Sequence, residues 1–280
     1  MMSMPHSPDP AAQIGQIQLR LQYQDLARRG VDLPTFQDVE FRCHSQNGED
    51  GILLYIFALI GTTNRKVVEI CAGDGIECNA ANLLVNHGWS GLLLDGDPEL
   101  VARGRSFYSA CLNTWVQPPT FVNAWITADG VNSVVGDHGF SGPLDLLSLD
   151  VDGNDYWIWK ALDCVTPRVV VLEFNAGCGP DVSVTMSYQP DFRLDYTVQP
   201  YRCGASLSAF VKLARVKGYR LVGVQSRGFN AFFVRNGIGD GLLRERSVTE
   251  CYGGIESLRR LTPADTENVL GGPHVWWEEV

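Results

Sequence analysis

Runs of consecutive apolar residues alternate along this chain with stretches in which apolar residues recur every three or four positions. The apolar runs predict strands over 67–71, 91–95, 121–127, 144–150 and 168–174. The recurring spacing predicts helices over 79–88, 98–111, 157–162 and 206–217. Strands that are apolar at almost every position are typical of a parallel sheet with helices on both faces. The pattern therefore predicts an α/β protein with a doubly wound sheet.

The alternation of predicted strands and helices changes near the end of the chain. Two apolar runs, 219–224 and 231–234, flank a short turn that contains Gly228. Two strands joined in this way form an antiparallel hairpin. We therefore expect a mostly parallel sheet of seven strands that ends in a C-terminal antiparallel hairpin.

The N-terminal part of the chain differs from the rest. Residues 1–10 are rich in Pro, Ser and Met and predict a tail, and residues 11–29 have helical spacing with Gly30 as a stop. The remainder of the 280 residues is long enough for one large core. We predict a tail and helical extension over 1–42 and one domain over 43–280. The extension helix is expected to pack on the domain, although it could also cover the active site or pair with a second subunit.

Charge and composition limit the classes of partner. The net charge is -10 and no run of Lys or Arg occurs, so neither nucleic acid nor an anionic membrane is an expected partner. No apolar stretch reaches the roughly 20 residues that span a bilayer, and the start of the chain lacks the pattern of a secretory signal. The eight cysteines are scattered, which argues against a disulfide framework or a zinc site. The expectation is a cytoplasmic protein that acts on a small molecule, with a homo-oligomer left open.

The first predicted strand leads directly into a Gly-x-Gly turn at Gly73 and Gly75. Glycines in such a turn adopt left-handed dihedrals and let the backbone come close to a ligand. A phosphate-binding turn would have a third glycine where this chain has Cys78. Asp74 in the turn and Glu69 on the strand would repel a pyrophosphate and favour a cationic nucleoside. The turn is therefore expected to bind S-adenosylmethionine.

Acids also follow the second and third predicted strands. Asp95 ends the second strand, roughly 20 residues after the turn, where a carboxylate can accept both ribose hydroxyls of an adenosine. Asp97 is better placed to cap the next helix. Asp129 follows the third strand, and it either reaches the adenine amino group or belongs to an Asp-Gly turn.

Further acids and amides follow the fourth and fifth strands, which end beside the same crevice. Asp150 and Asp152 follow the fourth strand, and Glu173 and Asn175 follow the fifth. In one interpretation Asp150, Glu173 and Asn175 hold Mg²⁺ or a similar cation that positions a substrate hydroxyl. In the other, Asp150 acts without a metal as general base or orients the methionine amine, with Asp152 beside it. So many acids close together are costly unless something cationic binds them.

A polar loop over 45–50 precedes a helix that begins at Gly51, and Asp50 or Asn47 is expected to cap this helix. Four histidines are candidate bases at neutral pH, none of them expected to be catalytic by itself: His44, His87, His138 and His274.

Several segments resemble, in the same order, those of FkbM-type methyltransferases. Residues 45–52 look like the SQ-x-GED-x-I opening of that family, and 68–75 with Asn79 resemble its first cofactor motif. Residues 88–91 are similar to its GW-x-G segment, and 149–153 to its ID-V-E-G strand end. The resemblance covers the chain from about Phe41 to Val234. Cys71 departs from the usual glycine, and Asp152 stands where the family often has Glu.

The resemblance implies a Rossmann-like class I methyltransferase fold and S-adenosylmethionine as methyl donor. It also implies O-methylation of a hydroxyl on a sugar or natural-product scaffold, as in biosynthesis. It places the cofactor at Glu69, Gly73, Gly75 and Asp95, with Asn79 in the same motif and the Gln46 loop near the pocket. It is uninformative about the substrate, which we expect over 176–204, where four side chains stand out: Tyr188, Arg193, Tyr196 and Tyr201.

Two other classes remain open. A nicotinamide-dependent oxidoreductase would share the first half of the fold, but it requires the third glycine and disfavours Asp74. A cofactor-binding protein without turnover would have no need to keep the costly acids.

Overall fold

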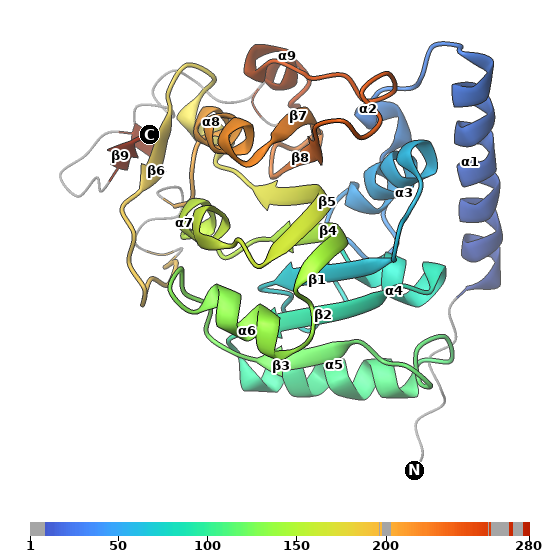
Figure 1. The fold of residues 1–280 in the computed structure, drawn as a ribbon, viewed down its shortest axis with the longest axis horizontal. Coiled ribbons are helices and arrows are strands. Elements are labelled where there is room, and N and C mark those ends of the chain that lie inside the picture. Colours follow the sequence, from blue (N-terminus) through green and yellow to red (C-terminus); the bar gives the residue numbers. More distant parts are fainter. Residues whose placement is uncertain (1–8, 196, 198–202, 257, 259–268, 271–276) are drawn as a thin grey trace.

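The computed structural model describes residues 9–195, 197, 203–256, 258, 269, 270 and 277–280. A seven-stranded sheet with the strand order β3-β2-β1-β4-β5-β8-β7 forms its centre (Figure 1). The strands are β1 (Lys66–Ile70), β2 (Ser90–Asp95), β3 (Thr120–Asn123), β4 (Gly142–Leu149), β5 (Val165–Glu173), β7 (Tyr219–Val224) and β8 (Asn230–Arg235). The first five are parallel, whereas β8 runs antiparallel to both β5 and β7. The predicted fold class and terminal hairpin are confirmed.

Helices cover both faces of this sheet. They are α1 (Pro10–Arg29), α2 (Phe36–Val39), α3 (Glu49–Ile60), α4 (Ala81–His87), α5 (Pro98–Ala110), α6 (Val131–Asp137), α7 (Asp155–Ala161), α8 (Leu207–Lys217) and α9 (Val248–Gly253). Side chains of α1 to α5 share one apolar core with the sheet, and side chains of α6 to α9 share the other. Successive strand residues supply the two cores in turn: Val67 packs towards α3 and α4, and Val68 towards α6 and α7. This explains why the strands are apolar at almost every position.

The third predicted strand is wrong in its last four residues, because β3 ends at Asn123 instead of residue 127. The Asn123 side chain and the Ala124 N–H both donate to the carbonyl of Asp95, at 3.1 and 2.9 Å. These bonds complete the pairing with β2, and the chain then turns towards the end of the sheet. Trp125 and Ile126, which continue the apolar run, line a cavity at that end.

Short elements are not predicted by the pattern. They include α2, α6, α9 and a small antiparallel sheet of β6 (Val184–Met186) and β9 (Trp277–Glu279). Trp277 of β9 is thus paired with Met186 of β6. Three candidate residues named from the sequence lie outside the described ones: His274, Tyr196 and Tyr201.

Helix ends follow the expected capping chemistry. The Asp97 carboxylate accepts from Glu99 N–H at the start of α5, and Ser206 caps α8 in the same manner. Gly30 ends α1 and Gly218 ends α8, both with left-handed dihedrals. Asp97 is thus the helix cap, as the sequence indicated.

The predicted cap of α3 is wrong. The helix begins at Glu49 after Gly48, and no side chain caps it, so neither Asn47 nor Asp50 has that role. Asp50 lies in the first turn, and one of its oxygens accepts the backbone N–H groups of residues 43–45 at 2.6–2.8 Å. The carboxylate therefore shapes the preceding loop.

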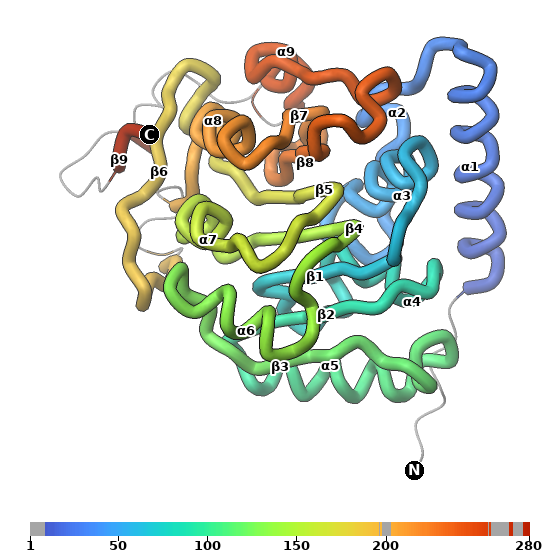
Figure 2. Tube along the Cα trace, in the orientation of Figure 1, coloured from blue at the N-terminus to red at the C-terminus, as the bar shows by residue number. Residues whose placement is uncertain are grey.

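A buried polar network fixes α1 to the domain. The Gln16 side chain exchanges hydrogen bonds with Asn82 of α4, at 2.9 and 3.2 Å, and its oxygen lies 2.7 Å from the ring nitrogen Nε2 of His87. Figure 2 shows α1 standing along the outer side of α3 and α4. None of the helices over the described residues has the length and apolar character needed to cross a membrane.

We expect His87 to make folding stability depend on pH. Burial, followed by the charges of Arg20 and Arg65, lowers the pKa of His87 from 6.5 to about 4. Between these two values the unfolded chain binds the proton more readily, so the imidazole contributes stability that is lost as the pH falls from 6.5 towards 4. The loss amounts to about 2–3 kcal/mol. Urea unfolding of the wild type and His87→Gln across this range measures it; the exposed His138→Gln is the control. An equal pH dependence of all three would contradict the assignment.

Candidate active site

A small cavity lies at the carboxyl ends of the parallel strands, where open α/β sheets bind ligands. Its walls come from the ends of β1 and β2, the chain after β3 and β4, and the start of α7. The most prominent side chains are Cys71, Asp95, Trp125, Asn154 and Phe192. Its volume is about 60 Å³. We call this cavity the crevice.

The glycine turn after β1 has the backbone that the sequence indicated. Gly73 and Gly75 have φ angles of 59° and 67°, a region that favours glycine. Cys71 and Asp152 adopt the same region, with φ angles of 64° and 57°. Strained dihedrals of this kind persist where the surroundings impose them, often at functional sites. Cys71 thus adopts a backbone conformation that favours glycine.

Asp95 lies where the sequence placed it, at the end of β2. One carboxylate oxygen accepts the Gly73 N–H at 2.7 Å, and the other accepts the Asp97 N–H at 2.8 Å. Asp95 therefore ties the glycine turn to the end of the neighbouring strand. Each carboxylate oxygen has a second lone pair, which is available to a ligand in the crevice.

Glu69 and Asn79 form a brace behind the glycine turn. The two Glu69 oxygens accept the N–H groups of Asn79 and Ala80, at 2.9 and 2.6 Å. Asn79 donates from its side chain to Ser148 of β4 at 3.1 Å. Burial raises the pKa of Glu69. Neither side chain is among those that line the crevice.

Asp74 is paired within the protein. One oxygen accepts the Ile76 N–H at 2.9 Å, and the other forms an ion pair with Arg103 of α5. These donors outweigh burial and lower the pKa of Asp74. Because Arg103 offsets the charge of Asp74, Asp74 does not supply the preference for a cationic ligand that the sequence predicts. The acids that would supply it are Asp95 and those that follow β4 and β5.

Three acids gather at the ends of β4 and β5. Asp150, Asp152 and Glu173 each offer a carboxylate oxygen, and these oxygens all lie within 4.8 Å of one another. The Asn175 side chain, two residues after Glu173, accepts the Gly177 N–H with its oxygen and donates from its amide to the Cys203 carbonyl. The metal site predicted from Asp150, Glu173 and Asn175 stays a prediction, and Asp152 is a further acid beside Asp150 and Glu173.

Mutual repulsion and burial perturb these acids. Burial, then the Asp152 charge, raises the pKa of Asp150 to about 6, and burial with Asp150 raises that of Glu173 well above its usual range. Asp155, fully buried in the first turn of α7, has its pKa raised to about 8 by burial and Asp150. Among the ion pairs of the described residues, none links Asp150 or Glu173 to Lys or Arg. Such a cluster favours an added cation.

The segment Tyr188–Phe192 closes the crevice. Its backbone accepts from the Trp125 indole at the carbonyl of Pro190 and from the Asn154 amide at that of Gln189, both at 2.7 Å. The Phe192 ring packs on Gly153, where a Cβ atom would come within 2.5 Å of it. Arg193 lies 4.5 Å from the Trp125 ring. Of the expected substrate residues, Tyr188 therefore belongs to this segment, and Arg193 follows it directly.

The loop over 43–48 lies near the glycine turn but does not line the crevice. The ring nitrogen Nδ1 of His44 lies 3.2 Å from the carbonyl of Ile76, just after that turn. Glu49, fully buried, accepts from Asn47 N–H at 2.9 Å and from the Asn230 side chain at 3.0 Å. Gln46 is exposed in this loop. The loop thus extends from the glycine turn of β1 to the start of β8.

Asp129 is exposed in the turn before α6 and does not line the crevice. Because β3 ends at Asn123, the chain leaves the sheet before it reaches Asp129. Asn154, one of the polar residues expected after the fourth strand, lines the crevice, whereas Trp125 and Phe192 were not predicted. The sequence contained a signal for Trp125, since a large apolar residue next to a strand end is poorly placed in solvent. It contained no such signal for Phe192.

The strand order, with one antiparallel strand between β5 and β7, defines the class I methyltransferase architecture. No protein-family model matches the chain, and no curated protein matches it.

Solved structures of this architecture resemble the chain distantly. The O-methyltransferase from Bacillus cereus in complex with SAH is 16% identical, with 81% of this chain and 90% of that chain covered and a TM-score of 0.42. The magnesium protoporphyrin IX methyltransferase from Synechocystis PCC 6803 with bound SAM is 13% identical, with coverages of 67% and 78% and a TM-score of 0.41. At this distance the sheet itself, and not these structures, assigns the fold class.

Proposed function

We propose that this protein is an S-adenosylmethionine-dependent methyltransferase that acts on a hydroxyl group of a small molecule. One observation carries the proposal: the Gly73 turn and Asp95 share a hydrogen bond at the mouth of the crevice, and the Asp150 cluster lies two strands along the same sheet edge. This arrangement suits an adenosine on one side and a cationic centre on the other. The ordered resemblance to FkbM-type enzymes supports the same choice.

The chain's residues fit the cofactor chemically. Asp95 would hold the ribose hydroxyls, and Trp125 would border the adenine. When bound, S-adenosylmethionine supplies a methyl group on a cationic sulfonium. Ligand pockets usually measure about 300–1,000 Å³, far more than the crevice offers in this closed state. The segment Tyr188–Phe192 would therefore move outwards to admit the nucleoside.

Two unsatisfied polar atoms support a hydroxyl acceptor. The side-chain nitrogen of Asn47 and the side-chain oxygen of Asn230 are buried, and neither has a hydrogen-bond partner among the described residues. Both residues bond to Glu49, and Asn230 pairs with Glu173 across β5 and β8. A hydroxyl both donates and accepts hydrogen bonds, so a substrate hydroxyl within reach of both atoms would satisfy them. Asp150 would accept the proton of the hydroxyl that reacts.

A divalent cation is part of the proposal. Asp150, Asp152 and Glu173 offer the hard oxygen ligands that Mg²⁺ prefers. When bound, the ion would lower the pKa of a substrate hydroxyl. Asp150 would then hold both the ion and the acceptor in place.

Calorimetric titration tests the proposal directly. We expect binding of S-adenosylhomocysteine and no binding of NADH, because a dinucleotide pyrophosphate would meet the Asp150 cluster. With S-adenosylmethionine and a panel of hydroxylated small molecules, formation of S-adenosylhomocysteine measures turnover. EDTA should lower that turnover and Mg²⁺ should restore it. Binding of NADH without binding of S-adenosylhomocysteine would overturn the proposed function. Binding of S-adenosylhomocysteine without transfer to any acceptor would indicate a cofactor-binding protein without turnover. Turnover that is insensitive to EDTA would exclude only the divalent cation.

A further inference from the structure

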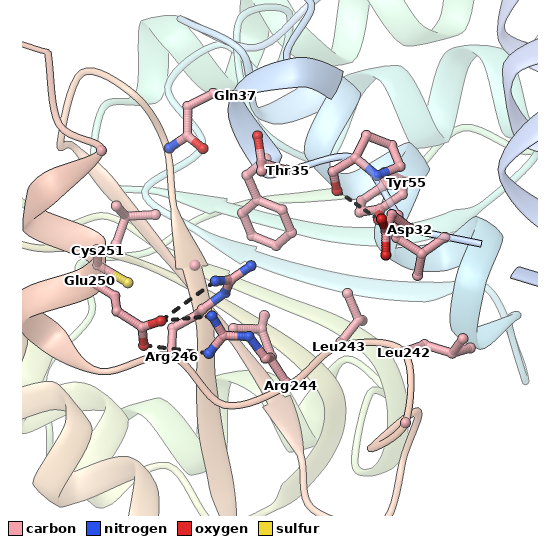
Figure 3. A pocket seen from close by; sticks show the side chains of 18 of the residues that line it. Asp32, Thr35, Gln37, Tyr55, Leu242, Leu243, Arg244, Arg246, Glu250 and Cys251 are labelled. Carbon is pink, nitrogen blue, oxygen red and sulfur yellow. Dashed lines mark hydrogen bonds and ion pairs between the residues drawn. The ribbon is translucent and has the colours of Figure 1, made fainter. Parts of the chain in front are cut away.

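A second pocket lies at the edge of the sheet, away from the crevice. It has a volume of about 500 Å³, within the range of small-molecule sites. Its walls are the edge strand β7, the chain from residue 31 to α2, and the loop 241–246 that leads to α9. It shares no lining residue with the crevice. We call it the edge pocket; Figure 3 shows it from close by.

The walls of the edge pocket are firmly held. Arg220 of β7 donates to the carbonyls of Leu243 and Ile238, at 3.0 and 2.8 Å, and so anchors the loop 241–246. The Arg246 N–H donates to the Leu221 carbonyl of β7 at 2.9 Å. These hydrogen bonds hold the walls of the pocket together and place Arg246 in one of them.

Two guanidinium groups in this pocket share one carboxylate. Arg244 lies 2.7 Å from Glu250, whereas Arg246 lies 3.7 Å from the same oxygen. Glu250 also accepts the Ser247 N–H at 2.8 Å, which completes the capping box of α9. Within this group of charges one positive charge is in excess. Figure 3 shows both arginines reaching towards Glu250 from the same stretch of chain.

Arg246 is the group available to a ligand. It makes no hydrogen bond through its guanidinium to any of the described residues, and its side chain is 36% exposed. A guanidinium presents several N–H donors in a plane that matches an oxyanion. Part of the remaining wall is apolar, and it is formed by Phe36, Val222 and Leu243. Across the pocket the exposed Asp32 disfavours a second negative charge.

We propose that the edge pocket binds a small organic monoanion, with its carboxylate or phosphate ester on Arg246 and its apolar body against Phe36 and Leu243. The excess positive charge attracts the anion, and Asp32 selects against more highly charged ligands. The site is separate from the proposed methyltransferase crevice and does not depend on it.

NMR titration of the full chain with phenylacetate tests this site. We expect shifts of resonances from the edge pocket, a much weaker response to the neutral analogue phenylacetamide, and weakening of phenylacetate binding by added salt. Arg246→Gln should weaken binding by about tenfold or more, because it removes a charge-assisted hydrogen bond. Phenyl methyl phosphate, tested in parallel, distinguishes a phosphate ester from a carboxylate as the preferred anion.

A pair of glycine variants keeps the test independent of the arginine. A Cβ atom added at Gly241, in the pocket wall, or at Gly253, outside it, has no neighbouring atom within 4 Å. Gly241→Leu should fill part of the pocket and abolish binding, whereas Gly253→Leu and the crevice variant Asp95→Ala should bind as the wild type does. Equal binding of phenylacetamide, wild-type affinity in Arg246→Gln and Gly241→Leu, or shifts confined to the crevice would each overturn the proposal.

Discussion

Replacing Asp150 with Asn is expected to lower the rate of methyl transfer by about 10²–10⁴-fold, the usual contribution of a positioned base. Asn cannot accept the proton of the acceptor hydroxyl, and it is a weaker ligand for a divalent cation. Its shape is nearly that of Asp, so the end of β4 should keep its backbone. The affinity for S-adenosylhomocysteine should change little, because Asp95 and the glycine turn are untouched. Single-turnover rates at saturating cofactor, together with calorimetry, measure the two effects.

The exposed Asp163→Asn serves as the matched control for this variant, because it removes the same charge from the surface. It should retain wild-type turnover. An Asp150→Asn protein that binds cofactor and turns over at the wild-type rate would exclude Asp150 from both roles. A variant that loses cofactor affinity as well as turnover would indicate that Asp150 contacts the methionine amine, which is the alternative role considered for it.

Asp95→Ala is expected to weaken S-adenosylhomocysteine binding at least tenfold, which corresponds to about 1.4 kcal/mol. Two hydrogen bonds from ribose hydroxyls to a carboxylate would be lost. The substitution also frees the Gly73 and Asp97 N–H groups. Asp95→Asn keeps an acceptor for one of them and should fall between Ala and the wild type. Calorimetry gives the affinities, and thermal unfolding shows whether each variant is folded.

Phe192→Ala should act in the opposite direction on the same affinity. Its ring fills space between Gly153 and the crevice, so its removal lowers the cost of admitting the nucleoside. We expect tighter or faster binding of S-adenosylhomocysteine, with Asp137→Ala as an exposed control for both variants. If Asp95→Ala bound like the wild type, the ribose would lie elsewhere. If Phe192→Ala bound more weakly, Phe192 would be part of the cofactor site instead of its closure.

The order of elements was predictable because it depends on local periodicity. Strands covered on both faces are apolar at almost every position, as Val67 and Val68 illustrate by facing opposite cores. The hairpin of β7 and β8 was equally visible as two apolar runs around one turn. The apolar pattern gave a wrong strand end at β3, because the apolar side chain of Trp125 lines the crevice and does not continue the strand.

The sequence by itself determined which residues stand at strand ends: Gly73, Asp95, Asp150 and Glu173 follow from the strand pattern, because the carboxyl ends of parallel strands meet at one edge. Only the tertiary structure decided what these residues meet. Arg103 pairs with Asp74, Asp152 joins Asp150 and Glu173 in the acidic cluster, and Phe192 lines the crevice. The physical reason is distance along the chain. Electrostatic pairing and packing depend on which segments fold back against each other, and no local pattern records a contact between residues such as Gly153 and Phe192.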